Sequence, residues 1–171
     1  DEAFTEARFR GMVDATFPIL HIASHFQFRP GNERDSFLLI GNDERLTLEQ
    51  IRRLDLPLGH VDLLTLSACQ TAMADGSNAR GAEVEGLGVL FMNQGARNVL
   101  ATLWQVEDGS TARLMYEFYL HRLQHPAHTK ARALREAQLL LLRGERNAGA
   151  LPRSLAHPYF WAPFVLMGNG L

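Results

Sequence analysis

The sequence predicts an α/β protein whose parallel or mostly parallel sheet is covered by helices on both faces. Short apolar segments at 19–24, 61–66 and 97–104 are typical of buried strands. A further strand is expected at 164–167, and helical patterns separate these segments from one another. Parallel neighbours in a sheet need a long crossover connection, usually a helix, so this alternation favours parallel pairing.

Capping residues and apolar periodicity indicate where the helices begin and end. Thr47 is followed three residues later by Gln50, the pattern of a capping box, so a helix should start at Thr47. Gly144 stands where the last helix should end, because glycine takes the left-handed conformation that terminates helices. The polar segment 26–36 is expected to be a loop, followed by a short strand at 37–40. The other expected helices are 2–13, 83–94, 108–123 and 129–143.

The length and composition suit one globular domain and argue against several classes of partner. The chain has 171 residues and a net charge of −2, which gives no basis for binding to nucleic acid or to an anionic membrane. No apolar run approaches the roughly 18 residues that span a bilayer. Cys69 is the only cysteine, so an internal disulfide is excluded, and a reducing, cytoplasmic location is expected.

Two of the predicted strands are followed by residues that suit nucleophilic catalysis. His25 follows the segment 19–24, and Cys69 follows the segment 61–66. The carboxyl ends of neighbouring parallel strands meet at one edge of a sheet, where crevices form. A histidine close to a thiol raises the fraction of reactive thiolate and can protonate a leaving amine. Taken alone, however, a single cysteine is more often a buried core residue than a nucleophile.

Several segments in the same order resemble the CHAT peptidases, a caspase-like family that is often joined to tetratricopeptide repeats. HIASH at 21–25 and LSACQT at 66–71 carry the catalytic part of this resemblance. The resemblance implies a three-layer αβα caspase-like fold with a mostly parallel central sheet, in which Cys69 is the nucleophile and His25 the catalytic histidine. It also implies that catalysis needs no cofactor. The remaining similar segments are 81–108, 114–119, 133–138 and 157–168.

Two residues beside His25 bear on the expected catalytic centre. His21 lies four residues earlier, inside the predicted strand, and should face the same side as His25 if the strand is regular. The family motif places the catalytic histidine at the strand end, so His21 is expected to be a structural or supporting residue. The family usually has glycine after the catalytic histidine, where this chain has Phe26. The resemblance implies an oxyanion hole formed by the backbone N–H groups of Phe26 and Cys69, whose geometry the missing glycine would alter.

Acidic residues after the third strand are candidates for substrate binding. LWQVED at 103–108 resembles the segment of separase whose last aspartate holds the basic residue before the scissile bond. The resemblance implies that Asp108 binds arginine or lysine of the substrate, with Glu107 as a second acid. Trp104 is expected to line the substrate pocket or the core. A compatible alternative is that Asp108 is the N-cap of the helix that follows it.

The resemblance covers nearly the whole chain and implies that residues 1–171 are the C-terminal part of a CHAT domain, whose early strands lie outside this chain. The leading hypothesis is a cysteine endopeptidase that cleaves a protein or peptide substrate after arginine or lysine. Its expected regulator is an upstream sensor or repeat region, on the same protein or on a separate chain. The alternative is a catalytically degenerate domain that binds a protein partner through the same groove, motivated by Phe26.

A third hypothesis is a ligand-binding domain that has Cys69 in its core. It is weaker, because no glycine-rich segment has the spacing of a phosphate-binding loop. No metal site is expected either, because the histidines of the second half of the chain do not have the spacing that is typical of metal-binding motifs. These histidines are His121, His125, His128 and His157.

Overall fold

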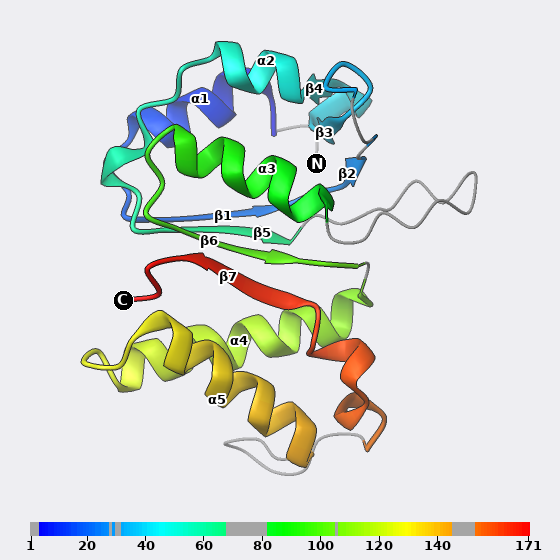
Figure 1. The fold of residues 1–171 in the computed structure, drawn as a ribbon, viewed down its shortest axis with the longest axis vertical. Coiled ribbons are helices and arrows are strands. Elements are labelled where there is room, and N and C mark those ends of the chain that lie inside the picture. Colours follow the sequence, from blue (N-terminus) through cyan, green and yellow to red (C-terminus); the bar gives the residue numbers. More distant parts are fainter. Residues whose placement is uncertain (1–3, 28, 30–31, 68–81, 105, 145–152) are drawn as a thin grey trace. The chain divides into compact units, whose positions relative to one another are not determined.

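The computed structural model has a mixed α/β fold with a mostly parallel central sheet, which confirms the fold class predicted from the sequence (Figure 1). This architecture is consistent with a caspase-like three-layer fold. The structure describes residues 4–27, 29, 32–67, 82–104, 106–144 and 153–171. The chain divides into a first unit, residues 1–105, and a second unit, residues 106–171.

Parallel strands form the centre of the first unit, and Ala23 and Ser67 are the last pair of the register between β1 and β5. All residues of β6 are buried, as expected for a central strand that reads as a continuous apolar run. The second predicted strand begins at Leu63 rather than at Val61, because a short 3₁₀ helix, η2 (Leu58–His60), reaches to that point. The strands, in the order β1-β5-β6, are β1 (Ile19–Ala23), β5 (Leu63–Ser67) and β6 (Asn98–Thr102).

Helices α1 (Glu6–Asp14) and α3 (Ala82–Asn93) lie on the same side of this sheet in Figure 1. Their buried rings Phe9 and Phe91 are in contact, with centroids 6.4 Å apart. Each such burial contributes on the order of 2 kcal/mol. The first helix begins at Glu6 and not at residue 2, because Thr5 is its N-cap and accepts a hydrogen bond from the N–H of Arg8 at 3.3 Å.

A small antiparallel sheet occupies the connection between β1 and β5. Its strands are β2 (Phe26–Gln27), β3 (Phe37–Leu39) and β4 (Arg45–Thr47). Phe26 is paired with Leu38, and Leu38 is paired with Leu46, so that these three buried side chains form a row across the sheet. The expected loop over 26–36 is therefore wrong at its start, where Phe26 and Gln27 form a strand. The predicted strand at 37–40 is confirmed as β3.

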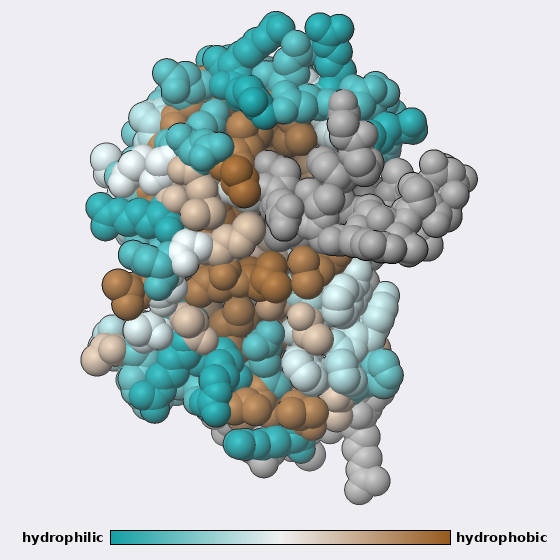
Figure 2. Space-filling view, viewed as in Figure 1, coloured by the Kyte–Doolittle hydropathy of each residue, from teal (hydrophilic) through white to brown (hydrophobic). Residues whose placement is uncertain are grey.

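Helix α2 (Leu48–Arg53) begins at the capping box that the sequence predicted. The hydroxyl of Thr47 accepts a hydrogen bond from the N–H of Gln50 at 3.1 Å, and the Gln50 side chain accepts one from the N–H of Thr47 at 2.8 Å. The outer face of this helix is charged, and Glu49 pairs with Arg53 at 2.7 Å and with Arg34 at 3.1 Å. Figure 2 shows mostly hydrophilic side chains at the top of the view, where α2 lies.

Gly95 ends α3 and permits a close approach of two backbone segments. Its φ angle is +109°, and a Cβ atom there would lie 2.9 Å from the backbone nitrogen of Gly59. Both facts require glycine, because other residues rarely adopt this conformation and would collide with η2. The helix expected over 83–94 therefore ends close to its predicted position, and the packing against η2 explains the glycine that follows it.

The second unit contains two long helices joined by a short turn and followed by a strand. Gly144 caps α5 with a left-handed φ of +66°, as predicted, and Thr129 caps its start. The side chain of Gln138 donates to the carbonyls of Trp161 and Phe164, both at 3.1 Å, which ties α5 to the segment that enters β7. The elements are α4 (Asp108–Gln124), α5 (Lys130–Arg143), the 3₁₀ helices η3 (Arg153–Ala156) and η4 (Pro158–Phe160), and β7 (Phe164–Gly168).

None of the helices in the described ranges combines the length and the apolar character that crossing a membrane requires.

Candidate active site

The neighbouring parallel strands β1 and β5 precede the two predicted catalytic residues in the sequence. Ala23 is paired with Ser67, and the chain leaves both strands directly after this pair. His25 follows Ala23 by two residues, and Cys69 follows Ser67 by two residues. Cys69 itself lies outside the described residues. The described part of the site is therefore built from the end of β1, the end of β5 and the small sheet.

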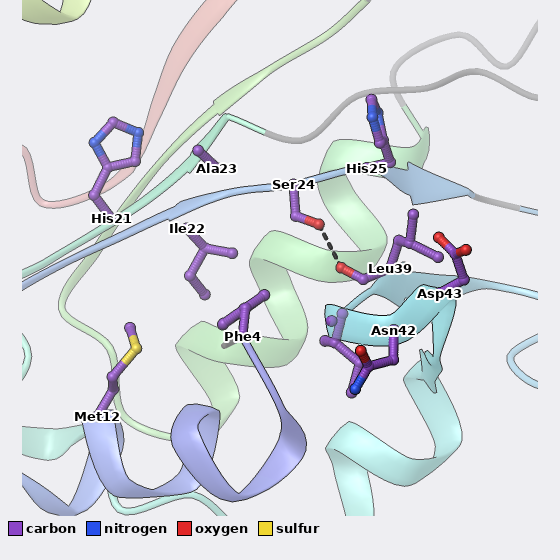
Figure 3. Close-up of a pocket in the computed structure, with 12 residues that line it drawn as sticks. Phe4, Met12, His21, Ile22, Ala23, Ser24, His25, Leu39, Asn42 and Asp43 are labelled. Atoms are coloured by element: carbon purple, nitrogen blue, oxygen red, sulfur yellow. Dashed lines mark hydrogen bonds between the residues drawn. The ribbon is translucent and has the colours of Figure 1, made fainter. Parts of the chain in front are cut away.

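His25 is held by its backbone, while its side chain remains exposed. Its carbonyl oxygen accepts a hydrogen bond from the N–H of Leu39 at 2.7 Å. The hydroxyl of the preceding residue, Ser24, donates to the carbonyl oxygen of the same Leu39 (Figure 3). Both backbone groups of Leu39 thus bind the segment that carries His25, and β3 fixes where this segment leaves the parallel sheet.

His21 lies inside β1 and contacts the end of β5. Its Nε2 atom and the Oγ atom of Ser67 are hydrogen-bonded at 2.9 Å. Burial lowers the pKa of His21, which favours the neutral imidazole at neutral pH. Figure 3 shows the rings of His21 and His25 on one side of the β1 segment and Ile22 on the other, as the regular alternation of a strand predicts.

A pocket of about 640 Å³ lies beside β1 and is shown in Figure 3. Apolar side chains such as Phe4 and Leu39 line it together with polar ones, among them His21, His25 and Asp43. Polar and apolar surface contribute about equally to its lining, so the cavity offers hydrogen-bonding groups as well as apolar contact to an organic ligand or a peptide side chain. His21 and His25 both belong to the lining of this cavity, although Figure 3 shows their rings on the side of the segment opposite to Ile22.

Comparison with protein families gives a match to the CHAT domain over residues 1–169. The chain belongs to the CHAT domain family. Among curated proteins, none matches this chain. The CHAT family is associated with caspase-like cysteine peptidases and related scaffolds, so the match supports that general class. The family match does not assign the catalytic dyad or the substrate preference, and both assignments depend on the residues of this chain.

Phe26, which stands where the CHAT motif usually has glycine, belongs to β2. Its side chain is only 3% exposed and packs in the row with Leu38 and Leu46. Its backbone does not have a positive φ, since the non-glycine residues with positive φ in the described ranges are Asn42, Asp43 and Asp55. Phenylalanine is thus accommodated at this position by an extended backbone. The role of its N–H in an oxyanion hole stays a prediction.

The predicted substrate residues Glu107 and Asp108 stand at the start of α4. Glu107, and not Asp108, is the N-cap residue, and its side chain makes no capping hydrogen bond. The alternative in which Asp108 is the N-cap is therefore wrong by one position. Asp108 is the first helical residue and is exposed, like Glu107. Trp104 belongs to the first unit and is half-buried. Their part in substrate binding stays a prediction.

Three of the histidines form a cluster where α4 ends and the chain turns into α5. The rings of His121, His125 and His128 have centroid separations of 4.6 to 5.2 Å; His128 stacks on the other two, whereas His121 and His125 are tilted. His121 Nε2 lies 3.0 Å from His128 Nδ1. Burial lowers the pKa of both His121 and His128; for His121 the charges of the other two rings act in the same direction. Within the described ranges, no three His, Cys, Asp or Glu side chains form a group that could hold a metal ion.

Two serines of the site were not predicted from the sequence. Ser24 and Ser67 are the hydroxyl groups that fix the ends of β1 and β5. Ser67 could have been found from the pattern, because His21 and a polar residue near the end of the next parallel strand should face each other. Ser24 could not have been found, because its partner Leu39 reaches it through the pairing of a small sheet, and that pairing is not visible in the sequence.

Proposed function

We propose that this CHAT domain is a cysteine endopeptidase in which Cys69 is the nucleophile and His25 is the general acid and base. The observation that carries the proposal is the register of β1 and β5. Ala23 and Ser67 are paired, and each proposed catalytic residue follows its member of this pair by two positions. Neighbouring parallel strands that end together are the usual way for an α/β fold to assemble a site from distant segments.

The proposed reaction proceeds through an acyl-enzyme. The Cys69 thiolate attacks the carbonyl carbon of the scissile peptide bond, and the resulting oxyanion is stabilised by the backbone N–H groups of Phe26 and Cys69. Collapse of this intermediate breaks the C–N bond, and the amine leaves with a proton from His25. Water, deprotonated by His25, then hydrolyses the thioester and restores the thiol. Every step uses groups of the chain and water alone.

The proposed substrate is a protein or peptide that is cleaved after arginine or lysine. Asp108 is the principal acid for the basic side chain, and Glu107 is the second one. Both carboxylates are exposed at the start of α4 and are accessible to a cationic group. Trp104 is the proposed apolar wall for the stem of the arginine or lysine side chain. An upstream sensor or repeat region is the proposed regulator.

A second candidate function is a scaffold that binds a protein partner without cleaving it. The observation that favours it is Phe26, whose bulky side chain is built into the core of the small sheet at the position where the family usually has glycine. If the oxyanion hole is distorted by this substitution, the groove remains but the rate falls.

The proposed function is tested by labelling with a peptidyl-arginine electrophile, next to a peptidyl-aspartate electrophile of the same length. Intact mass and peptide mapping locate the label, and Cys69→Ala is the control. We expect the arginine probe alone to label Cys69, and His25→Ala to slow labelling at neutral pH by at least about 100-fold. Labelling by the aspartate probe alone would retain the peptidase but exclude Asp108 as the selectivity residue. Labelling by neither would favour the scaffold.

A further inference from the structure

His21 is a titratable residue that the proposed dyad does not use. Its Nε2 atom is hydrogen-bonded to Ser67 Oγ at 2.9 Å, within the normal range for a well-formed hydrogen bond. Ser67 is the last residue of β5, and the chain continues from it to Cys69 two residues later. This bond therefore connects the strand that precedes His25 with the strand that precedes Cys69.

The bond runs diagonally across the two strands. In the parallel register His21 is opposite Thr65, whereas Ser67 is two residues farther toward the carboxyl end. The side chains of Thr65 and Ser67 point to the same face of β5, because side chains alternate along a strand. The His21 imidazole leans along its own strand and therefore reaches Ser67. The long side chain thus extends the contact between β1 and β5 to Ser67, the last residue of β5.

The protonation state of His21 suits a structural hydrogen bond. Burial lowers the pKa of its imidazole, so the neutral ring predominates at neutral pH. A neutral imidazole and a serine hydroxyl can each donate or accept, so one hydrogen bond joins them without bringing a charge to the sheet. Since Nε2 is occupied by Ser67, this ring is not arranged to exchange protons with a substrate through that atom.

We propose that His21 is a positioning residue that acts through Ser67 and fixes the carboxyl end of β5 relative to the segment that carries His25. The proposal rests on the proposed function, since it assigns Cys69 and His25 to the chemistry. A displacement of about 1 Å between two reacting groups lowers a rate on the order of 100-fold. The His21–Ser67 hydrogen bond joins the strands that precede His25 and Cys69, so its loss should lower kcat. Substrate affinity depends on other residues and should change little.

The test compares His21→Phe, His21→Gln, Ser67→Ala and the double variant His21→Phe/Ser67→Ala in the full chain. Phenylalanine keeps a ring without nitrogen atoms, and glutamine keeps a donor and an acceptor at similar reach. We expect His21→Phe and Ser67→Ala each to lower kcat about 10-fold with KM within about 2-fold. The double variant should be no slower than either single variant, because the two substitutions break the same bond. His21→Gln should recover kcat to within about 3-fold of wild type.

His60→Phe is the matched control. The Nε2 atom of His60 is hydrogen-bonded to the carbonyl of Ala15 at 3.0 Å, in the same unit but away from the ends of β1 and β5. Its loss should lower stability without changing kcat. Additive effects of His21→Phe and Ser67→Ala would overturn the proposal, as would unchanged kcat in both. Equal loss in His21→Gln and His21→Phe, with activity retained in His25→Ala, would instead make His21 the acid–base residue.

Failure of the proposed function is recognised separately, because wild-type protein would then neither cleave peptides nor react with the electrophiles. In that case hydrogen exchange at the backbone amides of residues 63–67 decides the positioning role. His21→Phe and Ser67→Ala should accelerate exchange at the end of β5 by at least about 10-fold, and His21→Gln should not. Unchanged protection in the first two variants would overturn the proposal.

Discussion

The backbone N–H of Leu39 donates to the carbonyl oxygen of His25 at 2.7 Å, and the Leu39 carbonyl accepts from the hydroxyl of Ser24. The small antiparallel sheet therefore determines the backbone position of the proposed catalytic histidine. A fixed backbone limits the directions in which the exposed imidazole can point, which is a form of preorganisation. Substitutions that disturb this connection should affect catalysis even though they do not touch the substrate.

Ser24→Ala should lower both stability and turnover. It leaves the Leu39 carbonyl without its hydroxyl partner, which costs about 1–2 kcal/mol of unfolding free energy in urea titrations, and it should lower kcat several-fold. Ser36→Ala is the matched control, because this buried hydroxyl donates to the carbonyl of Asn32 at 2.8 Å in the adjoining loop. The control should lose stability but keep kcat. Equal loss of kcat in both variants would show that general destabilisation explains the effect.

Phe26→Gly should not produce a better enzyme, although it restores the residue that the family usually has. The side chain packs in a buried row with Leu38 and Leu46, so its removal should cost at least about 3 kcal/mol of unfolding free energy. Phe26→Leu keeps the same N–H group and most of the packing, and should cost on the order of 1 kcal/mol with little change in kcat/KM. A higher kcat/KM in the glycine variant at unchanged stability would show that Phe26 limits the oxyanion hole.

Asp108→Asn should raise KM for arginine peptides about 10- to 100-fold, because a charge-assisted hydrogen bond to the substrate becomes a neutral one. Glu107→Gln should have the smaller effect. Asp108 is also the first residue of α4, where a carboxylate stabilises the helix by about 0.3–1 kcal/mol, so thermal unfolding is measured alongside. If KM is unchanged for arginine and lysine peptides in both variants, selectivity for basic residues lies elsewhere.

The histidine cluster should make the protein less stable in mild acid. The pKa values of His121 and His128 are lowered in the fold, so below pH 6.5 the unfolded chain binds more protons than the folded one. The free energy of unfolding should therefore be unaffected by these residues above this pH and should fall as the pH drops through it. Urea titrations between pH 7.5 and 5.5 measure this slope.

The variant His121→Gln/His128→Gln should show a shallower slope than wild type over this pH range. Leu123→Gln is the control on the same helix, because this exposed residue carries no titratable group. A slope in the double variant that equals that of wild type would assign the acid sensitivity to other residues.

Most of the fold could be predicted, because its strands are separate apolar runs and several of its helices have capping residues that can be recognised in the sequence. Thr47 and Gly144 have the predicted roles, since capping depends on residues that are close in sequence. β2 and β4 were missed because strands of two or three residues have no measurable alternation, and they form only through pairing with β3.

The position of His25 just after the first strand could be predicted, whereas the contacts that support it could not; the catalytic roles of His25 and Cys69 stay predictions. The order of strands and small residues identified His25, and the placement of His21 on the same face followed from the period of a strand. The N-cap was assigned to Asp108 instead of Glu107 because adjacent acids give the same local pattern. The hydrogen bond between Leu39 and His25 joins segments that are distant in sequence, so no local sequence pattern predicts it.

The insertion of the small sheet between β1 and β5 has a consequence for the order of folding. The pairs Phe26–Leu38 and Leu38–Leu46 join residues that are near in sequence, whereas Ala23 and Ser67 pair only after the whole intervening segment has been closed into a loop. Because loop closure costs entropy, local pairs form earlier than distant parallel ones. We therefore expect the histidine segment to reach its final conformation first, with the cysteine strand arriving late, so that a partly folded chain holds no complete dyad.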